Sequence, residues 1–334
     1  MEALEFLEDT KKIILERDNM YTKIIFQQFI LFVLAATLLQ ACNQKIKGVP
    51  ITDTPISGSI NISVDESFEP VIKEQIKMYE TSFPNTKINA LYKTESECLK
   101  DFFNDSATRL VIVTRGLTDA EDKYMTAKVG FNPGWQEVAT DAIAVVVNKK
   151  SVDSFFTLND LQQTLQGKIN KNKTIVFDGL KQTSTVRFIQ DSVLKGMPID
   201  TSVVKAVKNS DEVLDYIATH ENAIGFVGIN RIGNPEDYAQ LEILKKIKIS
   251  LIQCDLCQYK PFILPTQQSI LNRRYPLVRG LHYIVKESYK GLGNGFATFL
   301  QYERGQLIFK RAYLGPIMNF NVRNVNLNEK LPKD

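Results

Sequence analysis

The chain has 334 residues, with 41 Lys and Arg against 38 Asp and Glu, which gives a formal net charge of +3. These charges are spread along the sequence and form no dense basic cluster, which argues against a nucleic-acid-binding protein. The length is sufficient for two lobes, each with its own hydrophobic core.

A long apolar run near the N-terminus ends in a cysteine. No charged residue lies between Ile24 and Ala41, Lys23 precedes the run and Cys42 follows it. A positive start, an apolar middle and a small-residue end are typical of a bacterial export signal. The last residues, Leu-Gln-Ala-Cys, resemble the lipobox at which bacterial lipoproteins are cleaved and lipidated. We therefore predict a signal peptide over residues 1–41 and a lipid anchor on Cys42. An uncleaved N-terminal anchor is the alternative, since the run is near the lower length limit for a membrane span.

The residues before Met20 carry six acidic and three basic side chains, the wrong sign for the start of an export signal. We therefore expect translation to start at Met20. Residues 42–57 show no apolar periodicity and are interpreted as a flexible tether. Without residues 1–41 the chain has 37 basic and 32 acidic residues, a net charge of +5.

Strand and helix patterns alternate after the tether, which predicts an α/β protein built on mostly parallel sheets. The strands expected in the first part are Ser59–Val64, Lys87–Tyr92, Leu110–Thr114 and Ala142–Val147. The helices expected there are Pro70–Phe83, Glu95–Asn104 and Thr118–Val129.

A second set of alternating patterns follows. Its expected strands are Thr174–Phe177, Ala223–Val227, Lys245–Gln253 and His282–Val285. Its expected helices are Leu158–Leu165, Thr185–Leu194, Asp211–Thr219, Gly295–Gln301 and Glu303–Lys310. The polar tail, residues 321–334, is expected to be frayed.

Seven short motifs resemble, in order, those of the phosphate-binding proteins of bacterial phosphate ABC importers, and most closely the Bacteroidetes lipoproteins of that family. They are Val64–Pro70, Val113–Thr118, Ala139–Ala144 followed by Val147-Asn148, Thr183–Phe188, Ala223–Gly228, Tyr275–Arg279 and Arg304–Gln306. The resemblance implies a two-lobed periplasmic-binding-protein fold with a ligand cleft between lobes that close by a hinge. One lobe would contain residues 58–147 and 260–320, and the other residues 148–259.

The resemblance further implies a periplasmic, lipid-anchored, monomeric protein that captures inorganic phosphate for an ABC permease and needs no cofactor. Its ligand contacts would come from Ser67, Arg115, Asp141, Thr183, Ser184, Thr185 and Arg187. Several of these follow a predicted strand, where ligands bind in open α/β sheets. The first turn of a helix offers free N–H groups to an oxyanion, and the Arg115 guanidinium offers a bidentate fork.

Asp141 has the most specific predicted role. A carboxylate can accept the proton of monohydrogen phosphate, whereas sulfate has no proton at neutral pH, so Asp141 would reject sulfate by repulsion. Simpler roles remain open. Arg115 would form a surface ion pair, Asp141 would brace the strands between the lobes, and Ser67 and Thr183–Thr185 would cap helices. Tyr275–Arg279 is interpreted mainly as a structural motif at the start of a strand.

The sequence also departs from the family pattern. Asp65 and Glu66 replace small hydroxyl residues in the first ligand loop, and Gly179 stands where many members carry an arginine. Arg187 lies one position later than usual. Another oxyanion, or a cationic or peptide ligand, therefore remains open. A second alternative also remains open: a sensory or interaction lipoprotein that keeps this fold but acts on another envelope complex.

An enzyme has little support, because no nucleophile elbow, phosphate-loop motif or metal-ligand cluster is present in the sequence. The pair Cys254 and Cys257 is a possible disulfide in an oxidising compartment. A zinc site would need two more ligands, and the chain has only 2 His.

Overall fold

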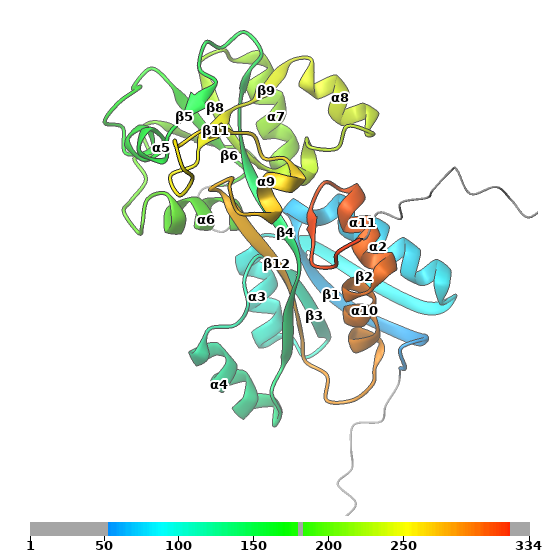
Figure 1. Cartoon of the computed structure of the whole chain (residues 1–334). Helices are drawn as coiled ribbons and strands as arrows, with labels where there is room; N and C mark the ends of the chain where they lie inside the picture. Colours follow the sequence, from blue (N-terminus) through cyan, green and yellow to red (C-terminus); the bar gives the residue numbers. More distant parts are fainter. Residues whose placement is uncertain (1–52, 180–182, 321–334) are drawn as a thin grey trace, which may run out of the picture. The chain divides into compact units, whose positions relative to one another are not determined.

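The computed structural model of the chain describes residues 53–179 and 183–320 (Figure 1). The predicted signal peptide, the lipidation site Cys42 and the tail 321–334 lie outside these residues. Asp53, in the predicted tether, is buried and accepts hydrogen bonds from the backbone N of Leu292 (2.6 Å) and the hydroxyl of Tyr289 (2.7 Å). The fold therefore begins before the predicted end of the tether. Among the described residues, no helix has the length and apolar character that a membrane span requires.

A single curled sheet organises the fold, with the strand order β2-β1-β3-β12-β4-β8-β6-β7. The first half of the sheet consists of β1 (Ser57–Asp65), β2 (Asn85–Lys93), β3 (Thr108–Val113) and β12 (Val278–Val285). The second half consists of β6 (Thr174–Phe177), β7 (Val204–Ala206) and β8 (Ala223–Gly228). Strands β1, β2 and β3 are parallel to one another, as are β6, β7 and β8, whereas β12 and β4 run antiparallel to their neighbours. The predicted α/β fold class is confirmed.

Strand β4 (Gly134–Asn148) belongs to both halves of the sheet (Figure 1). Its residues 134–142 pair with β12, and its residues 143–148 pair with β8 and with β9 (Ile247–Ile249). Two-residue β13 (Gly315–Pro316) also pairs with β4. The sequence predicted only Ala142–Val147 as a strand, because the first residues of β4, Gly134 to Gln136, are exposed and form no apolar run.

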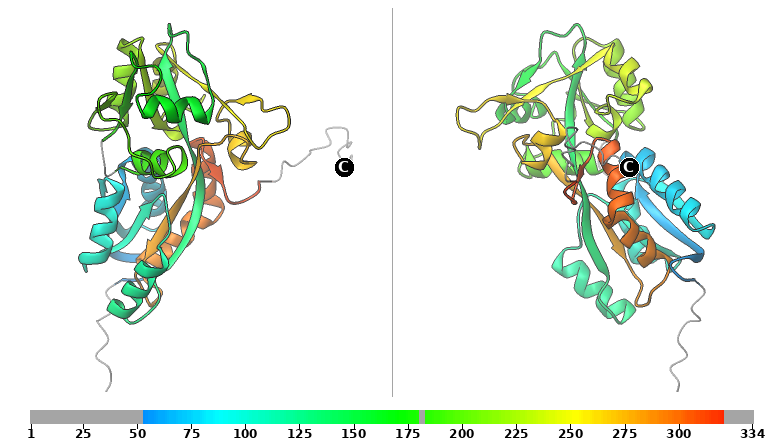
Figure 2. Two further views of the ribbon diagram at one scale, coloured as in Figure 1. Left: turned by 90° about the vertical axis from the view of Figure 1, so that its left-hand side faces the viewer. Right: turned by 45° about the vertical axis from the view of Figure 1, so that its right-hand side comes forward.

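Helices cover both faces of the first half of the sheet, as the views of Figure 1 and Figure 2 together show. Val111 and Val113 of β3 share a core cluster with Phe102 of α3 (Glu95–Asn104), whereas Leu110 and Ile112 belong to the cluster on the opposite face. That opposite cluster includes residues from α2 (Glu69–Ser82), α10 (Leu292–Gln301) and α11 (Glu303–Arg311). Alternating β3 side chains therefore fill two separate cores.

The start of a helix is set by a capping box at two places in this half. Thr94 caps α3 with Glu97, and Thr118 caps α4 (Asp119–Val129) with Glu121. Gly130, with φ of 82°, ends α4 in the left-handed conformation that glycine adopts readily.

The second half of the sheet carries four helices: α5 (Leu158–Leu165), α6 (Ser184–Ser192), α7 (Ser210–Thr219) and α8 (Tyr238–Leu244). Helix α7 lies close to β8 at Gly225, where a Cβ atom would stand 2.8 Å from Val213 Cγ1 and 2.9 Å from Ile217 Cγ1. The missing side chain of Gly225 therefore allows this close packing.

A small sheet of β5 (Phe155–Phe156), β10 (Leu251–Gln253) and β11 (Phe262–Ile263) lies beside the second half. The sequence predicted one continuous strand over Lys245–Gln253. This prediction is wrong, because the strand is interrupted at Ser250: β9 pairs with β4, whereas β10 pairs with β5 and β11. The chain then reaches short helix α9 (Gln267–Leu271) before β12.

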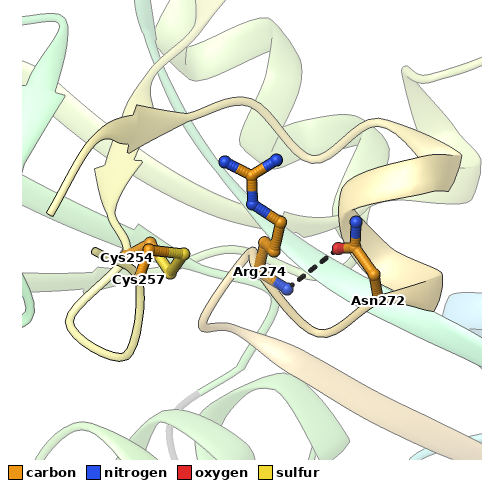
Figure 3. The surroundings of a disulfide bond; sticks show 4 residues. All are labelled: Cys254, Cys257, Asn272 and Arg274. Atoms are coloured by element: carbon orange, nitrogen blue, oxygen red, sulfur yellow. Dashed lines mark hydrogen bonds between the residues drawn. A yellow bond between two sulfur atoms is a disulfide. The ribbon is translucent and has the colours of Figure 1, made fainter. Parts of the chain in front are cut away.

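Cys254 and Cys257 form a disulfide between β10 and β11, with their Cα atoms 5.4 Å apart (Figure 3). Figure 3 shows it beside the segment of Asn272 and Arg274, where the Arg274 backbone N donates to Asn272 Oδ1 over 3.2 Å. The bond closes a tight turn at the start of the loop that links the two strands. The pair that the sequence offered as a possible disulfide is thus bonded.

Candidate binding site

Six polar side chains gather where the two halves of the sheet meet, and we call this group the polar cluster. They come from the end of β1, from two short 3-10 helices, η1 (Glu66–Phe68) and η2 (Ile229–Arg231), and from β4, α6 and β12. The members of the cluster are Asp65, Ser67, Asp141, Ser184, Asn230 and Arg279. All six are buried, and even the most accessible, Asn230, is only 6% exposed.

Arg279 joins the two halves at the centre of the cluster. It lies opposite Asp141 in the β12–β4 pairing, and its Nε donates to Asp141 Oδ2 over 2.8 Å. Its Nη1 donates to the hydroxyl of Ser184, at the start of α6, over 3.0 Å. The guanidinium carbon lies 5.2 Å from the centroid of the Phe68 ring, within cation–π range. Arg279 is therefore held on three sides.

The β1–η1 turn and η2 meet on another side of the cluster. Asp65 Oδ1 accepts a hydrogen bond from the backbone N of Ser67 over 3.0 Å, which caps η1. Asn230 Nδ2 donates to the carbonyl oxygen of Ser67 over 3.1 Å. Arg231 Nη2 donates to the carbonyl oxygen of Glu66 over 2.8 Å. Two side chains of η2 therefore bind the backbone of η1.

Among the described residues, 53–179 and 183–320, five buried polar atoms of the cluster have no hydrogen-bond partner. They are Asp65 Oδ2, Ser67 Oγ, Asp141 Oδ1, Asn230 Oδ1 and Arg279 Nη2. A buried polar group without a partner costs about 1–3 kcal/mol, so a native fold rarely keeps several together unless something binds them. This concentration makes the polar cluster the candidate binding site.

Gly228 shows that polar groups of the cluster converge on one space. A Cβ atom at Gly228 would lie 3.3 Å from Asn230 Oδ1, 3.5 Å from Asp141 Oδ2 and 3.6 Å from Arg279 Nη2. Any side chain here would therefore project among these polar atoms, and glycine keeps side-chain atoms out of the cluster.

The hydroxyls that begin α6 are divided between the cluster and Asp178. Thr183 is the N-cap residue, and its Oγ1 also donates to Asp178 Oδ1 over 2.9 Å. The hydroxyls of Thr185 and Ser210 each lie 3.3 Å from Asp178 Oδ2. Burial raises the pKa of the Asp178 carboxyl, against these hydrogen bonds. Ser184 alone of the three predicted hydroxyl residues belongs to the polar cluster.

Arg115 and Arg187 lie apart from the cluster, along a cavity of about 490 Å³ that Glu95, Glu121 and Thr183 also line. Nη1 and Nη2 of Arg115 donate to the Glu121 carboxylate, over 2.7 and 2.8 Å, in the ion pair that the sequence left open. These hydrogen bonds to Arg115 hold the pKa of the Glu121 carboxyl at about 2. Arg115 is thus already paired.

Arg187 connects α6 to the first half of the sheet. Its Nη2 donates to Glu95 Oε1 over 3.2 Å and to Thr114 Oγ1 over 2.7 Å. Burial alone would raise the pKa of the Glu95 carboxyl, but its bonds to Arg187 and Thr114 lower it overall. Glu95 is therefore a buried anion that fixes Arg187 across the two halves.

Three members of the polar cluster were not among the ligand contacts predicted from the sequence: Asp65, Asn230 and Arg279. Asp65 was noted only as a departure from the family pattern. Arg279 was assigned a mainly structural role, and its motif does brace the fold, since the Tyr275 hydroxyl donates to the carbonyl oxygen of Ile143 over 2.9 Å. Asn230 follows β8 directly, so the rule that ligands bind beyond strand ends could have found it.

Comparison with known proteins gives a family. A family model described as the PBP superfamily domain matches residues 50–304, well over half of the chain. No curated protein matches the chain.

Solved structures share the fold at low sequence identity. A phosphate ABC transporter substrate-binding protein from Clostridium perfringens, solved with bound phosphate, is 19% identical with a TM-score of 0.63, over 78% of this chain and 100% of that one. An ABC-type phosphate transport receptor from Vibrio cholerae is 15% identical with a TM-score of 0.58, over 78% and 100%. The regulatory domain of MetR, a LysR family regulator from N. meningitidis, is 10% identical with a TM-score of 0.51, over 78% and 100%.

The strand order, the long strand shared by both halves of the sheet and the match to the family model agree with the fold expected from the sequence motifs. The predicted periplasmic-binding-protein fold is confirmed, and the chain belongs to the PBP superfamily.

Proposed function

We propose that this protein is a solute-binding protein that captures inorganic phosphate in the polar cluster for an ABC importer. The observation that carries the proposal is the set of five unpartnered, buried polar atoms at the junction of the two halves. Bound phosphate in the C. perfringens protein of the same fold supports the choice of ligand.

The cluster contains the groups that a protonated oxyanion requires. Arg279 Nη2 and the Ser67 hydroxyl are free to donate to phosphate oxygens, and N–H groups in the first turn of α6 add the positive end of the helix dipole. Asp141 Oδ1 is free to accept the phosphate proton. Sulfate brings no proton at neutral pH, so its oxygen would face the Asp141 carboxylate and be repelled.

The other predicted contacts have supporting roles in this proposal. Thr183 and Thr185 hold Asp178 and fix the start of α6. Arg187 and Arg115 would attract the anion at the cavity of about 490 Å³, although each is paired with a carboxylate. Arg115 would touch phosphate only if it released Glu121.

We propose that the two halves act as lobes, residues 58–147 with 260–320 and residues 148–259, that close on the ligand. The bonds from Arg187 to Glu95 and from Asn230 to the Ser67 carbonyl would form when the lobes close. Chain crossings at β4 and β12 would then serve as the hinge.

A lipid on Cys42 would hold the protein at the periplasmic side of a membrane, with the permease as its partner and the protein itself as a monomer. Replacing Cys42 by alanine should then release the protein from membranes after export. Continued membrane association would favour an uncleaved anchor.

A sensory or interaction lipoprotein is the second candidate. Two further buried acids, Asp65 and Asp178, lie at or beside the polar cluster and weigh against a dianion. The regulatory domain of MetR has a similar fold, so this fold is compatible with a regulatory role.

Calorimetric titration of the detergent-solubilised full chain, first dialysed against a phosphate scavenger, tests the proposal. We expect micromolar or tighter phosphate binding and no heat from sulfate. Asp141→Asn should narrow the difference between the two anions, whereas Asp119→Asn, an exposed site on α4, should leave it unchanged. Absence of binding by both anions would refute phosphate capture and favour the sensory candidate.

A further inference from the structure

Acceptors outnumber donors among the unpartnered atoms of the polar cluster. Asp65 Oδ2, Asp141 Oδ1 and Asn230 Oδ1 are acceptors, Arg279 Nη2 is a donor, and the Ser67 hydroxyl can serve as either. A ligand that pairs with both carboxylate oxygens of this set must bring two hydrogen-bond donors as well as oxygens that accept. A fully unprotonated oxyanion has no donors, and a monohydrogen oxyanion has one.

The charges of the cluster lead to the same requirement. Arg279 is its one cation, and the Arg279 guanidinium already neutralises the Asp141 carboxylate through the bond to Oδ2. Asp65 then remains as an additional carboxylate that is fully buried and, within the described part of the chain, has no ion-pair partner of its own. A doubly charged anion would therefore enter a cluster whose formal charge is already negative, which is costly in a low-dielectric interior.

The surroundings of Asp65 offer it little compensation. Facing it are Arg279 from β12, Ser184 from α6, and Glu95 and Cys98 from α3. Arg279 is shared with Asp141, and Glu95 repels the charge of Asp65. Burial therefore raises the pKa of Asp65 to about 6, with Glu95 adding to the effect and Arg279 opposing it.

We propose that Asp65 is a second proton acceptor of the site, so that the site takes the singly charged, dihydrogen form of a tetrahedral oxyanion, with inorganic phosphate as the probe. The two hydroxyls of the ligand donate to Asp65 Oδ2 and Asp141 Oδ1. Its two unprotonated oxygens accept from Arg279 Nη2 and the Ser67 hydroxyl. This inference rests on the proposed phosphate site and adds the protonation state of its ligand.

Proton balance makes the proposal measurable. At pH 8 free phosphate is mostly the monohydrogen dianion and Asp65 is ionised, so the complex must take one proton from the solvent. The apparent affinity should therefore fall about tenfold for each pH unit above the second pKa of phosphate. A site with Asp141 as its single acceptor would bind the dianion without proton uptake.

Glu66 is the group most able to imitate this behaviour. It neighbours Asp65, and burial together with Asp178 and Asp65 raises the pKa of Glu66 to about 7, although Arg231 opposes the shift. Its side chain is only partly buried and belongs to none of the unpartnered set. Glu66→Gln is therefore the matched control for Asp65→Asn.

The experiment is calorimetric titration of the full chain with phosphate from pH 6.5 to 9, repeated at pH 8 in buffers of different ionisation heat to count protons. We expect the wild type and Glu66→Gln to lose about tenfold in affinity per pH unit on the alkaline side and to take up about one proton. Asp65→Asn should bind phosphate with an affinity that does not change on the alkaline side and should take up no proton, because the asparagine amide can donate to an unprotonated oxygen.

Each result decides between separate claims. If no variant, including the wild type, binds phosphate, the proposed phosphate site fails. If the wild type binds phosphate with constant or rising affinity toward pH 9 and no proton uptake, only the dihydrogen form is refuted. The role of Asp65 would also be overturned if the fall of phosphate affinity with pH were lost in Glu66→Gln and kept in Asp65→Asn. The wild-type proton count alone tests the proposal if Asp65→Asn does not fold.

Discussion

Replacing Arg279 by methionine should strongly destabilise the protein, even without ligand. Arg279 is 4% exposed and Asp141 is fully buried, with their bond at 2.8 Å. Methionine keeps most of the side-chain volume but leaves the Asp141 carboxylate buried without its cation. Removing one partner of a buried ion pair costs about 3–5 kcal/mol, whereas replacing both partners by apolar residues is often nearly neutral. The bond from Arg279 to Ser184 is lost as well.

Urea unfolding of the ligand-free protein measures this cost. Arg279→Met should lower the free energy of unfolding by about 3–5 kcal/mol, and the double variant Arg279→Met/Asp141→Leu should recover most of that loss. A cost below about 1 kcal/mol for Arg279→Met, or a double variant as unstable as the sum of its single changes, would refute the reasoning. Either result would mean that the pair is not the tight buried contact described here.

Three other changes have defined outcomes. Because the pKa of Asp65 is raised to about 6, the free energy of unfolding of the ligand-free protein should fall by about 3 kcal/mol as pH rises from about 4 to 6. Asp65→Asn should remove this pH-dependent loss of stability. Urea midpoints of Asp65→Asn with the same pH dependence as the wild type would contradict the prediction. Glu95→Gln should cost about 1.5–3 kcal/mol at neutral pH and speed amide hydrogen exchange at the start of α6, because Arg187 loses a charged partner. Unaltered exchange there would argue against the link. Replacing Cys254 and Cys257 by serine should cost about 2 kcal/mol, the chain-entropy scale for so short a loop. Phosphate affinity should stay unchanged, since the small sheet contributes no member of the polar cluster; a large loss of affinity would show coupling between the two regions.

Local patterns predicted most helices and strands because the relevant signals are local. The helix predicted over Glu95–Asn104 is α3 itself, since the Thr94–Glu97 capping box and the apolar spacing lie within a few residues. The first part of β4 was missed for the opposite reason. Its residues Gly134, Trp135 and Gln136 are exposed and form no apolar run, and they become a strand because β12 pairs with them.

The candidate site was predictable only in part. Ser67, Asp141 and Ser184 follow from motifs near strand ends and helix starts, and all three belong to the polar cluster. Arg279 reaches the site through its pairing with Asp141, which is 138 residues away in sequence. Such a register depends on the whole sheet, so the sequence motif alone marked Arg279 as structural.

Arg115 shows that one motif can suit two different partners. The bidentate geometry that suits an oxyanion also suits a carboxylate. Glu121, six residues later and one turn into α4, occupies that fork in the structure. Sequence spacing gave no means of choosing between the two partners.

A crystal structure of the chain soaked with arsenate, a heavier analogue of phosphate with an anomalous signal, would test the central claim most directly. The account predicts one arsenic peak beside Gly228, with oxygens within hydrogen-bonding distance of Arg279 Nη2, Ser67 Oγ and Asp141 Oδ1. An arsenic peak in the cavity between Arg115 and Arg187, with the polar cluster empty, would contradict it.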